Sequence, residues 1–527
     1  MSRLASLTPT LLPLITMLAC RAGEGSNTTD EVGDGDGDGI ETSSSAGESS
    51  SDASESSSDD PSSDSTDADA DSTDADDGIK FDLPILPDAG GGPVLPTIPE
   101  TCAQALMIES TVGCSFHANK MQNFQEEPTS LVVGNVSDEN PATLQLYFGP
   151  PGGGEQAVGG PIMIPPGGTH EFVLNMPGEP GDVSVLRQGG AHRVESDRPV
   201  VAYQHSPISA VAHNDSSMLI PDHALGQNYI VAAWSTNIGN DYSYFNVVGI
   251  EENTTVEWQP RNATAAGSGV PAVGALATGM VVIGAYDMLQ VTASSDVSGT
   301  IISTSEPAWV VGAVPCVNIP ANVTYCDHIE ELMLPLEYWG EQYVGAHAPQ
   351  RGNEDYWWRI YSGDDAVTIT TDPPQPGTPA LLDRGEFIEF STQQSFIATA
   401  DGPFLPVQYL EGQDGGAGTG DPASYQMVPT EQFLPRYVFV TGTGYDENYV
   451  QITRPQGGAD VLVDGAVVTG YYAVGEFEVA DWSISQGAHV AESDDAFGVI
   501  QVGYTDVTSY AYPGGLRLAK INPNPQG

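Results

Sequence analysis

One phrase recurs four times in this sequence, and it limits the chain to a fold built from repeated units. Each copy runs from an acidic segment into a short apolar stretch, usually through a proline. The copies are "RVESDRPVVAYQHSP" (193–207), "STSEPAWVVGA" (303–313), "ATADGPFLPVQY" (398–409) and "AESDDAFGVIQVGY" (491–504). Acidic side chains help to reverse the chain, and proline is tolerated at the first residue of a strand. The phrase therefore predicts a turn that leads into the central strand of each unit.

Two further patterns recur in register with this phrase. A proline precedes a tyrosine by the same interval in the pairs Pro221 and Tyr229, Pro335 and Tyr343, and Pro429 and Tyr437. Pairs of β-rich runs also flank a polar turn, as in "YFNVVGIEENTTVEWQP" (244–260) and "DYWWRIYSGDDAVTITT" (355–371), which is typical of hairpins. The sequence predicts an all-β fold of tandem antiparallel modules with approximate units 119–212, 213–313, 314–409 and 410–515. Sandwich-like modules are the favoured arrangement, and a closed, propeller-like ring is the alternative.

The charge balance limits the possible partners. The net charge is −56, and the only lysines are Lys80, Lys120 and Lys520. Nucleic acid is excluded as a partner, because duplex phosphates would be repelled and counterion release requires Lys and Arg. The sequence also has no basic patch to hold a polyanionic glycan.

The first twenty residues predict export. "MSRLASLTPTLLPLITMLAC" has a basic start, an apolar stretch and then "MLAC", which resembles a bacterial lipobox. We expect residues 1–20 to be a lipoprotein signal peptide and Cys20 to carry lipid, which would anchor the chain to a membrane. An ordinary signal peptide with a chance cysteine is the alternative.

The next segment predicts a spacer. Residues 21–84 are rich in Ser, Asp and Gly and nearly free of apolar side chains, so we expect a disordered acidic stalk, followed by a proline-rich junction at 85–100. "DGDGDGIE" (34–41) resembles the start of a calcium loop, but Ser45 stands where a bidentate glutamate is needed. We expect no cofactor, with weak calcium binding as the alternative.

The remaining cysteines lie in two local pairs. Cys102 and Cys114 are close in sequence, as are Cys316 and Cys326. Three pairings are possible, and an oxidising compartment favours the two local disulfides. A zinc site is not expected, because neither pair has CxxC spacing and no histidine set completes one.

The strongest polar run is "CDHIEE", which contains Asp327, His328, Glu330 and Glu331. These side chains could bind metal or move protons, but the favoured interpretation is a loop held by a disulfide. Other candidate positions are the histidine pair His205 and His213, whose spacing matches no known ligand pattern, and the adjacent tryptophans Trp357 and Trp358. In a strand, one tryptophan would face the core, and a neighbouring module would cover the other more readily than a ligand would.

A family resemblance extends over residues 101–520. The segments "SDRPVVAYQ", "MLIPDHALGQNYIV", "CDHIEELMLPLEYWGEQYV" and "GAHVAESDDAFGVIQVGYTDVTSYAYPGG" together resemble the IgGFc-binding protein N-terminal domain family, as found in bacterial, myxobacteria-like surface lipoproteins. The resemblance implies binding or adhesion rather than catalysis, and it transfers no binding residue to this chain.

The sequence contains no HExxH, phosphate-binding loop or GxSxG motif. We therefore expect no enzyme but a cell-surface lipoprotein, placed in the cell envelope at the outer membrane or cell surface, that adheres to or recognises a protein or glycan. The alternatives are a metal-dependent or hydrolytic surface enzyme and a structural envelope protein.

Overall fold

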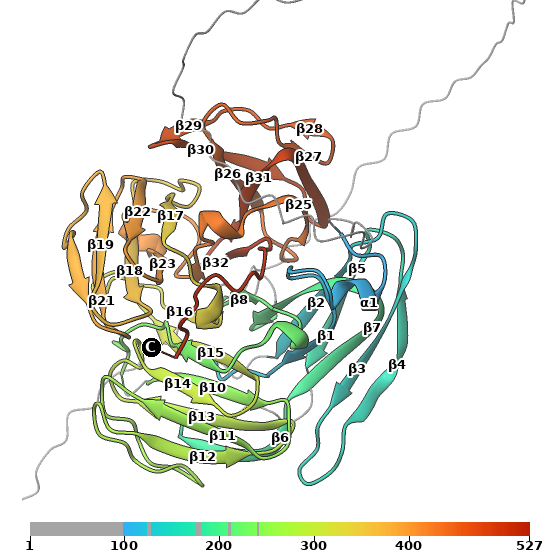
Figure 1. Cartoon of the computed structure of the whole chain (residues 1–527), viewed down its shortest axis with the longest axis vertical. Helices are drawn as coiled ribbons and strands as arrows, with labels where there is room; N and C mark the ends of the chain where they lie inside the picture. Colours follow the sequence, from blue (N-terminus) through green and yellow to red (C-terminus); the bar gives the residue numbers. More distant parts are fainter. Residues whose placement is uncertain (1–97, 124–127, 175–180, 209–211, 240–241, 527) are drawn as a thin grey trace, which may run out of the picture. The chain divides into compact units, whose positions relative to one another are not determined.

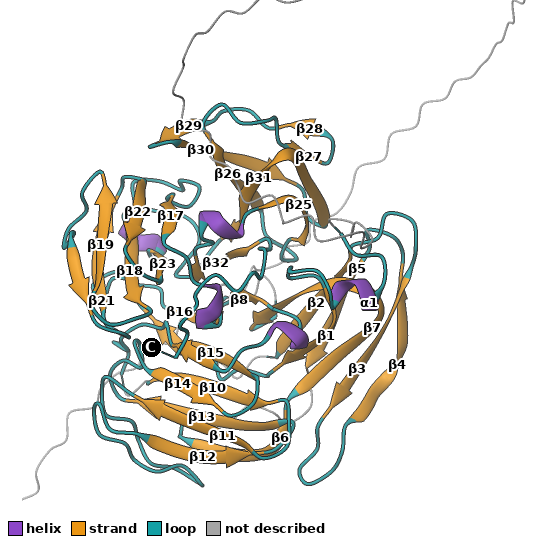
Figure 2. Ribbon diagram, viewed as in Figure 1, coloured by secondary structure: helices purple, strands orange, loops and turns teal. Residues whose placement is uncertain are grey.

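Antiparallel strands make up nearly all of the regular structure (Figure 2). This computed structural model describes residues 98–123, 128–174, 181–208, 212–239 and 242–526. The predicted signal peptide with Cys20, the stalk and the calcium-like loop lie outside these ranges. The all-β prediction is confirmed.

The first module is one sheet bent around a long strand. Its elements are α1 (Cys102–Ala105), β1 (Gly113–Ala118), β2 (Thr129–Asn135), β3 (Ala142–Phe148), β4 (Gln156–Ile164), β5 (Thr169–Leu174), β7 (His192–Ser206) and β8 (Asp215–Met218). The strand order is β4-β3-β7-β2-β5, and β1 and β8 also pair with β7. β7 can serve both halves because its first part pairs with β3 and its second part with β2.

The second module contains two sheets, ordered β16-β15-β10-β13-β6 and β12-β11-β14-β9. Its elements are β6 (Val185–Gly190), η1 (Asp222–Ala224), β9 (Asn228–Ile230), β10 (Ser243–Gly249), β11 (Thr254–Gln259), β12 (Gly279–Ile283), β13 (Asp287–Ala293), β14 (Ile301–Thr304), β15 (Ala308–Val317) and β16 (Asp327–Leu332). Every residue of β15 is buried, as its continuous apolar run predicts for a core strand.

The third module repeats this plan with the sheets β17-β22-β19-β20 and β21-β18-β23-β24. Its elements are η2 (Leu336–Tyr338), β17 (Gln342–Gly345), β18 (Tyr356–Ser362), β19 (Val367–Asp372), β20 (Ala380–Leu382), β21 (Phe387–Thr392), β22 (Phe396–Ala400), β23 (Phe404–Leu410), η3 (Gln413–Gly415) and β24 (Ser424–Gln426).

The fourth module again shares one long strand between its two halves. Its elements are η4 (Thr430–Gln432), β25 (Leu434–Val440), β26 (Glu447–Pro455), β27 (Leu462–Val463), β28 (Ala466–Val467), β29 (Tyr472–Val474), β30 (Phe477–Ile484), β31 (Ala488–Thr505) and β32 (Thr508–Pro513). The strand order is β28-β27-β31-β26-β30-β29, and β25 and β32 also pair with β31.

The recurring acidic phrase marks the corner between the two halves of each module. The Asp197 carboxylate accepts the Thr143 N–H at 2.7 Å, and the Asp401 carboxylate accepts the Thr368 N–H at 2.6 Å. In both modules, an aspartate carboxylate at the corner thus accepts a hydrogen bond from a backbone N–H of the neighbouring strand. The predicted turn interrupts the strand only in the second and third modules. In the first and fourth modules, β7 and β31 run through the corner unbroken, so the prediction of a turn is wrong there.

The proline–tyrosine interval also has a structural cause. Each proline carbonyl accepts a hydrogen bond that closes the short 3-10 turn η1, η2 or η4. The hydroxyl groups of Tyr229, Tyr343 and Tyr437 then each accept the backbone N–H of the residue three positions earlier. The interval therefore fixes how the chain enters each successive module.

Four short strands, which we name the axial strands, close the modules into a ring. The axial strands β8, β16, β24 and β32 form hairpins with the core strands β7, β15, β23 and β31. Each axial strand contacts two others, in the order β8, β16, β24, β32 and back to β8, and β8, β16 and β32 are labelled in Figure 1. Paired sheets and a closed ring, stated above as alternatives, therefore occur together. The predicted unit boundaries at 313 and 409 fall inside β15 and β23, each of which is the first strand of such a hairpin.

Candidate functional site

The predicted polar run lies on an axial strand. Asp327, His328, Glu330 and Glu331 all belong to β16, and no more than 2% of any of them is exposed. The interpretation of this run as a loop is wrong, because the residues pair with β15 and are covered by β8 and β24.

Asp215 of β8 joins three axial strands through one carboxylate. Its Oδ2 accepts the backbone N–H of Glu330 at 3.1 Å and that of Ser424 at 3.0 Å. Burial raises the pKa of Asp215 well above its ordinary value, although these hydrogen bonds oppose the rise. Asp215 therefore holds the ring together from inside.

Glu330 is paired on both of its oxygens. Gln204 donates its side-chain N–H to Oε1 at 3.0 Å, and His328 Nε2 lies 3.1 Å from Oε2. Burial likewise raises the pKa of Glu331 well above its ordinary value, and the nearby acids Asp215 and Glu330 raise it further, whereas Gln426 lowers it. Gln204, His328 and Glu330 thus form a buried network of polar side chains.

The two tryptophans face different surroundings. Trp358 is fully buried, whereas Trp357 is half-buried and lies edge-on to Trp234, with ring centroids 6.1 Å apart. Trp234 belongs to the preceding module, so a neighbouring module covers Trp357.

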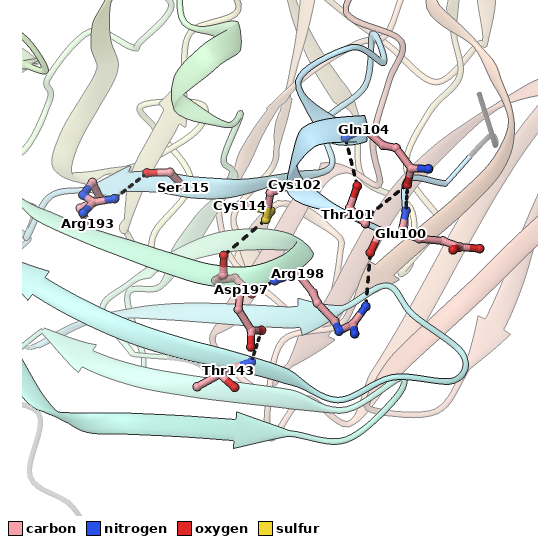
Figure 3. Close-up of a disulfide and its surroundings, with 11 residues drawn as sticks. Glu100, Thr101, Cys102, Gln104, Cys114, Ser115, Thr143, Arg193, Asp197 and Arg198 are labelled. Atoms are coloured by element: carbon pink, nitrogen blue, oxygen red, sulfur yellow. Dashed lines mark hydrogen bonds between the residues drawn. A yellow bond between two sulfur atoms is a disulfide. The ribbon is translucent and has the colours of Figure 1, made fainter. Parts of the chain in front are cut away.

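Both local disulfides are present, so their prediction is confirmed. The Cys102–Cys114 bond ties α1 to β1 (Figure 3). Thr101 and Gln104 form a capping box at the start of α1. The second bond, Cys316–Cys326, joins the end of β15 to the residue before β16.

A surface pocket of about 520 Å³ opens on the second module. We name it the acidic pocket. Its lining residues are Asp222, His223, Ile250, Glu251, Glu252, Glu306 and Pro307. The carboxylates come from η1 and from the turns β10–β11 and β14–β15. The three glutamates are exposed, so their charges face solvent.

The acidic pocket is anchored to the first module through Asp222. His117 donates its backbone N–H to Asp222 Oδ1 at 2.9 Å and places Nδ1 2.9 Å from the same oxygen, while the Ser115 hydroxyl donates to Oδ2. Burial raises the pKa of Asp222, but His117 and these hydrogen bonds outweigh it and hold the pKa below its ordinary value. Asp222 thus keeps its charge at the base of the pocket.

A second pocket, of about 540 Å³, shares Pro307 with the first. It includes Glu337 and the C-terminal residues Lys520 and Asn522, and Lys520 Nζ lies 3.5 Å from Glu337 Oε1. Sequence reasoning missed both pockets, because their walls come from turns that are far apart along the chain. The repeated turn positions were the only available signal.

The fold and its surface define a class of protein: a ring of duplicated β modules that carries pockets formed largely by its turns. Residues 215–503, more than half of the chain, match the family described as IgGFc binding protein, and the chain belongs to this family. A human IgGFc-binding protein is 23% identical over 381 residues, which are 68% of this chain and 7% of the human protein. The chain thus spans only a small part of the length of that relative.

The family match begins at Asp215, the first residue of β8. It therefore contains the second, third and fourth modules almost completely, together with the acidic pocket. Within the described ranges, no helix is long and apolar enough to cross a lipid bilayer.

Proposed function

We propose that this chain is a noncatalytic recognition protein that binds a protein partner through the acidic pocket and the turns around it. The observation that carries the proposal is the pocket itself, in which three exposed glutamates and the charged Asp222 surround one cavity. Such a surface fits a partner that presents Lys or Arg side chains. Family membership supports binding rather than catalysis.

The buried network on β16 argues against the hydrolytic alternative. A general acid or base must lie within hydrogen-bond reach of a substrate. The side chains of His328 and Glu330 are fully buried and bonded to each other, and neither lines the two surface pockets. We assign this network to ring closure.

The N-terminal sequence supports the cellular part of the proposal. A lipid on Cys20 would anchor the chain in the cell envelope, and the acidic stalk would hold the β modules away from the membrane at the cell surface. Adhesion to a protein partner is the role that such a placement favours. Mass spectrometry of the membrane-extracted chain tests the anchor, since unmodified Cys20 would contradict it.

A binding assay with the full chain tests the pocket. IgG Fc fragments, mucins and a glycan array are the probes, and binding is measured at low and high salt. We expect a protein probe to bind, and E251Q/E252Q/E306Q to weaken that binding about tenfold because rim charges contribute modestly. Salt should weaken it too.

The matched control is D364N/D365N, which removes two carboxylates at the β18–β19 turn of the third module, the counterpart of the β10–β11 turn. This variant should bind as the parent does. Equal loss in both variants would mean that overall charge, not the pocket, governs binding. Binding that is confined to glycans and indifferent to the triple variant would overturn the proposal.

A further inference from the structure

β12 is an edge strand with one side unpaired. It ends its sheet at the outside of the second module (Figure 1) and pairs only with β11. Successive residues of an antiparallel strand point their N–H and C=O groups to alternate sides, so part of this backbone points away from β11. Within the described ranges, residues 279–283 make no backbone–backbone hydrogen bond outside the ladder with β11. β12 therefore presents backbone donors and acceptors to which one more strand can bind.

The side chains on the solvent face of β12 are apolar. Met280 and Val282 are 54% and 55% exposed, whereas Ile283 is buried in the core. The sequence has no charged residue between Arg261 and Asp287, although the net charge of the chain is −56. The edge is thus a neutral, apolar strip on an acidic protein.

A leucine in the loop before β12 is held in an exposed position. Leu276 is 63% exposed and has φ 61°, in the left-handed region that bulky residues seldom adopt. The Pro260 carbonyl accepts the Leu276 N–H at 2.7 Å, and Gln259 donates its side-chain N–H to the Leu276 carbonyl at 3.0 Å. The leucine backbone is therefore already ordered, so binding a partner there costs little conformational entropy.

The corresponding edge strands of the other three modules are less suited to pairing. β4 contains Pro161, which has no N–H, and its pairing with β3 is irregular between Leu144 and Leu146. β20 has three residues, and β28 has two. Prolines, irregular pairing and short length are devices by which proteins protect a sheet edge. β12, with five residues, no proline and no charge, has none of these protections.

We propose that β12 pairs antiparallel with β12 of a second copy of this chain and so joins two chains into a dimer. An antiparallel pair of identical strands is self-complementary about a twofold axis. Two chains of net charge −56 repel each other where their acidic surfaces meet, and a neutral edge avoids that repulsion. A basic partner would instead gain more from the acidic surfaces. The dimer is independent of the recognition function, because no residue of β12 lines either pocket.

The acidic side chain that shares the solvent face with Met280 is compatible with this pairing. Glu257 of β11 lies directly opposite Met280 in the ladder. In the dimer both β12 strands lie between the two copies of Glu257, which are therefore three strand spacings, about 14 Å, apart. This separation exceeds the Debye length of about 8 Å at physiological ionic strength, so their repulsion is largely screened.

Sedimentation velocity of the full chain over a concentration series is the test. We expect the parent to show a monomer–dimer equilibrium. M280K/V282K should weaken dimerisation at least about tenfold, because like charges then meet across the new strand pair. L381K is the matched control, since Leu381 is 68% exposed on the edge strand β20 of the third module. This control should dimerise as the parent does.

Mixing charge variants distinguishes a second copy from another occupant. M280K/V282K and M280E/V282E should each be monomeric where the parent is dimeric, and their equimolar mixture should regain the dimer. A parent that stays monomeric at every concentration would overturn the proposal. A dimer that M280K/V282K leaves intact, or that L381K weakens equally, would do the same.

Vesicles of neutral phosphatidylcholine test a lipid surface as the occupant of the same edge. We expect the parent and M280K/V282K to behave alike in flotation with these vesicles, because the edge is engaged by protein. Flotation that only the parent shows, together with a monomeric parent in solution, would assign the edge to lipid and overturn the dimer.

Discussion

The axial strands β16 and β32 occupy equivalent places in the repeat, yet they carry opposite chemistry. Both strands end a core hairpin, both are buried, and both contact β8 and β24. β16 reads "DHIEEL" and β32 reads "TSYAYP". The backbone hairpin that both strands share therefore determines how the ring closes, and the side chains of the axial strands can differ between modules.

The hydroxyl groups of both tyrosines of β32 donate hydrogen bonds. The Tyr512 hydroxyl donates to the Val440 carbonyl at 2.7 Å, and the Tyr510 hydroxyl donates to Asn448 Oδ1 at 2.8 Å. The Tyr512 ring stacks on Tyr203 at 4.6 Å. On β16, by contrast, one oxygen of Glu331 has no hydrogen-bond partner. The aromatic side of the ring should therefore stabilise the fold, whereas the acidic side should make the fold sensitive to base.

Tyr512→Ala should cause the largest loss, because it removes the ring that stacks on Tyr203 and the hydroxyl group that donates to the Val440 carbonyl. We expect the free energy of unfolding to fall by about 3–5 kcal/mol. Chemical denaturation of the full chain, followed by tyrosine and tryptophan fluorescence, measures the change. A loss no larger than that of Tyr510→Phe would mean that ring packing does not dominate the stability of β32.

Acid should weaken the aromatic side through His205. This histidine lies edge-on to Tyr510 and Tyr512, at 5.9 Å from each, and burial lowers its pKa to about 3. The unfolded chain binds a proton below about pH 6.5 and the folded chain does not, so stability falls as pH drops from 6.5 toward 3. His205 should contribute a loss of about 3 kcal/mol by pH 4.

The variant His205→Phe isolates this effect, because it keeps an aromatic ring and removes the titration. Between pH 6.5 and 4, its unfolding free energy should decline less steeply than that of the parent. His192, whose pKa burial lowers to about 4, adds acid sensitivity to both proteins and cancels in the comparison. Parallel pH profiles would contradict the assignment.

Base should weaken the acidic side. Because the pKa of Glu331 is raised in the fold, the carboxyl group stays protonated there, whereas the unfolded chain releases the proton above about pH 4.5. The stability that depends on this proton is present below that pH and is lost as pH rises. Glu331→Gln keeps an oxygen for Gln426 and should stabilise the chain by about 1–2 kcal/mol at alkaline pH.

Melting temperatures of the parent and Glu331→Gln at acidic and alkaline pH provide the measurement. The two proteins should melt together at pH 4 and diverge at pH 9. A difference that does not depend on pH would show that the substitution acts through packing instead.

The same contrast shows what the sequence could reveal. The repeat, the all-β fold and the local disulfides depend on short-range patterns in the sequence. In the structure, the acidic phrase lies at the corner of each module, and the proline–tyrosine interval corresponds to the tyrosine hydrogen bonds. The burial of Glu330 could not be predicted from the residues next to it in the sequence. Its hydrogen-bond partners Gln204 and Asp215 lie more than a hundred residues away along the chain. His213 was missed as a neighbour of the Cys316–Cys326 disulfide for the same reason, and the acidic pocket needs three separate turns to come together.

Tyr510→Phe should have the smallest effect and so calibrates the others. It keeps the stacking of Tyr510 on Tyr512, at 5.2 Å, and removes only the hydrogen bond to Asn448. We expect a loss of about 1 kcal/mol that is the same at pH 5 and pH 8, because neither Phe nor the folded tyrosine titrates there. Double-mutant analysis with Asn448→Ala measures the pair directly. If the loss equalled that of Tyr512→Ala, hydrogen bonds rather than ring packing would account for the stability of β32.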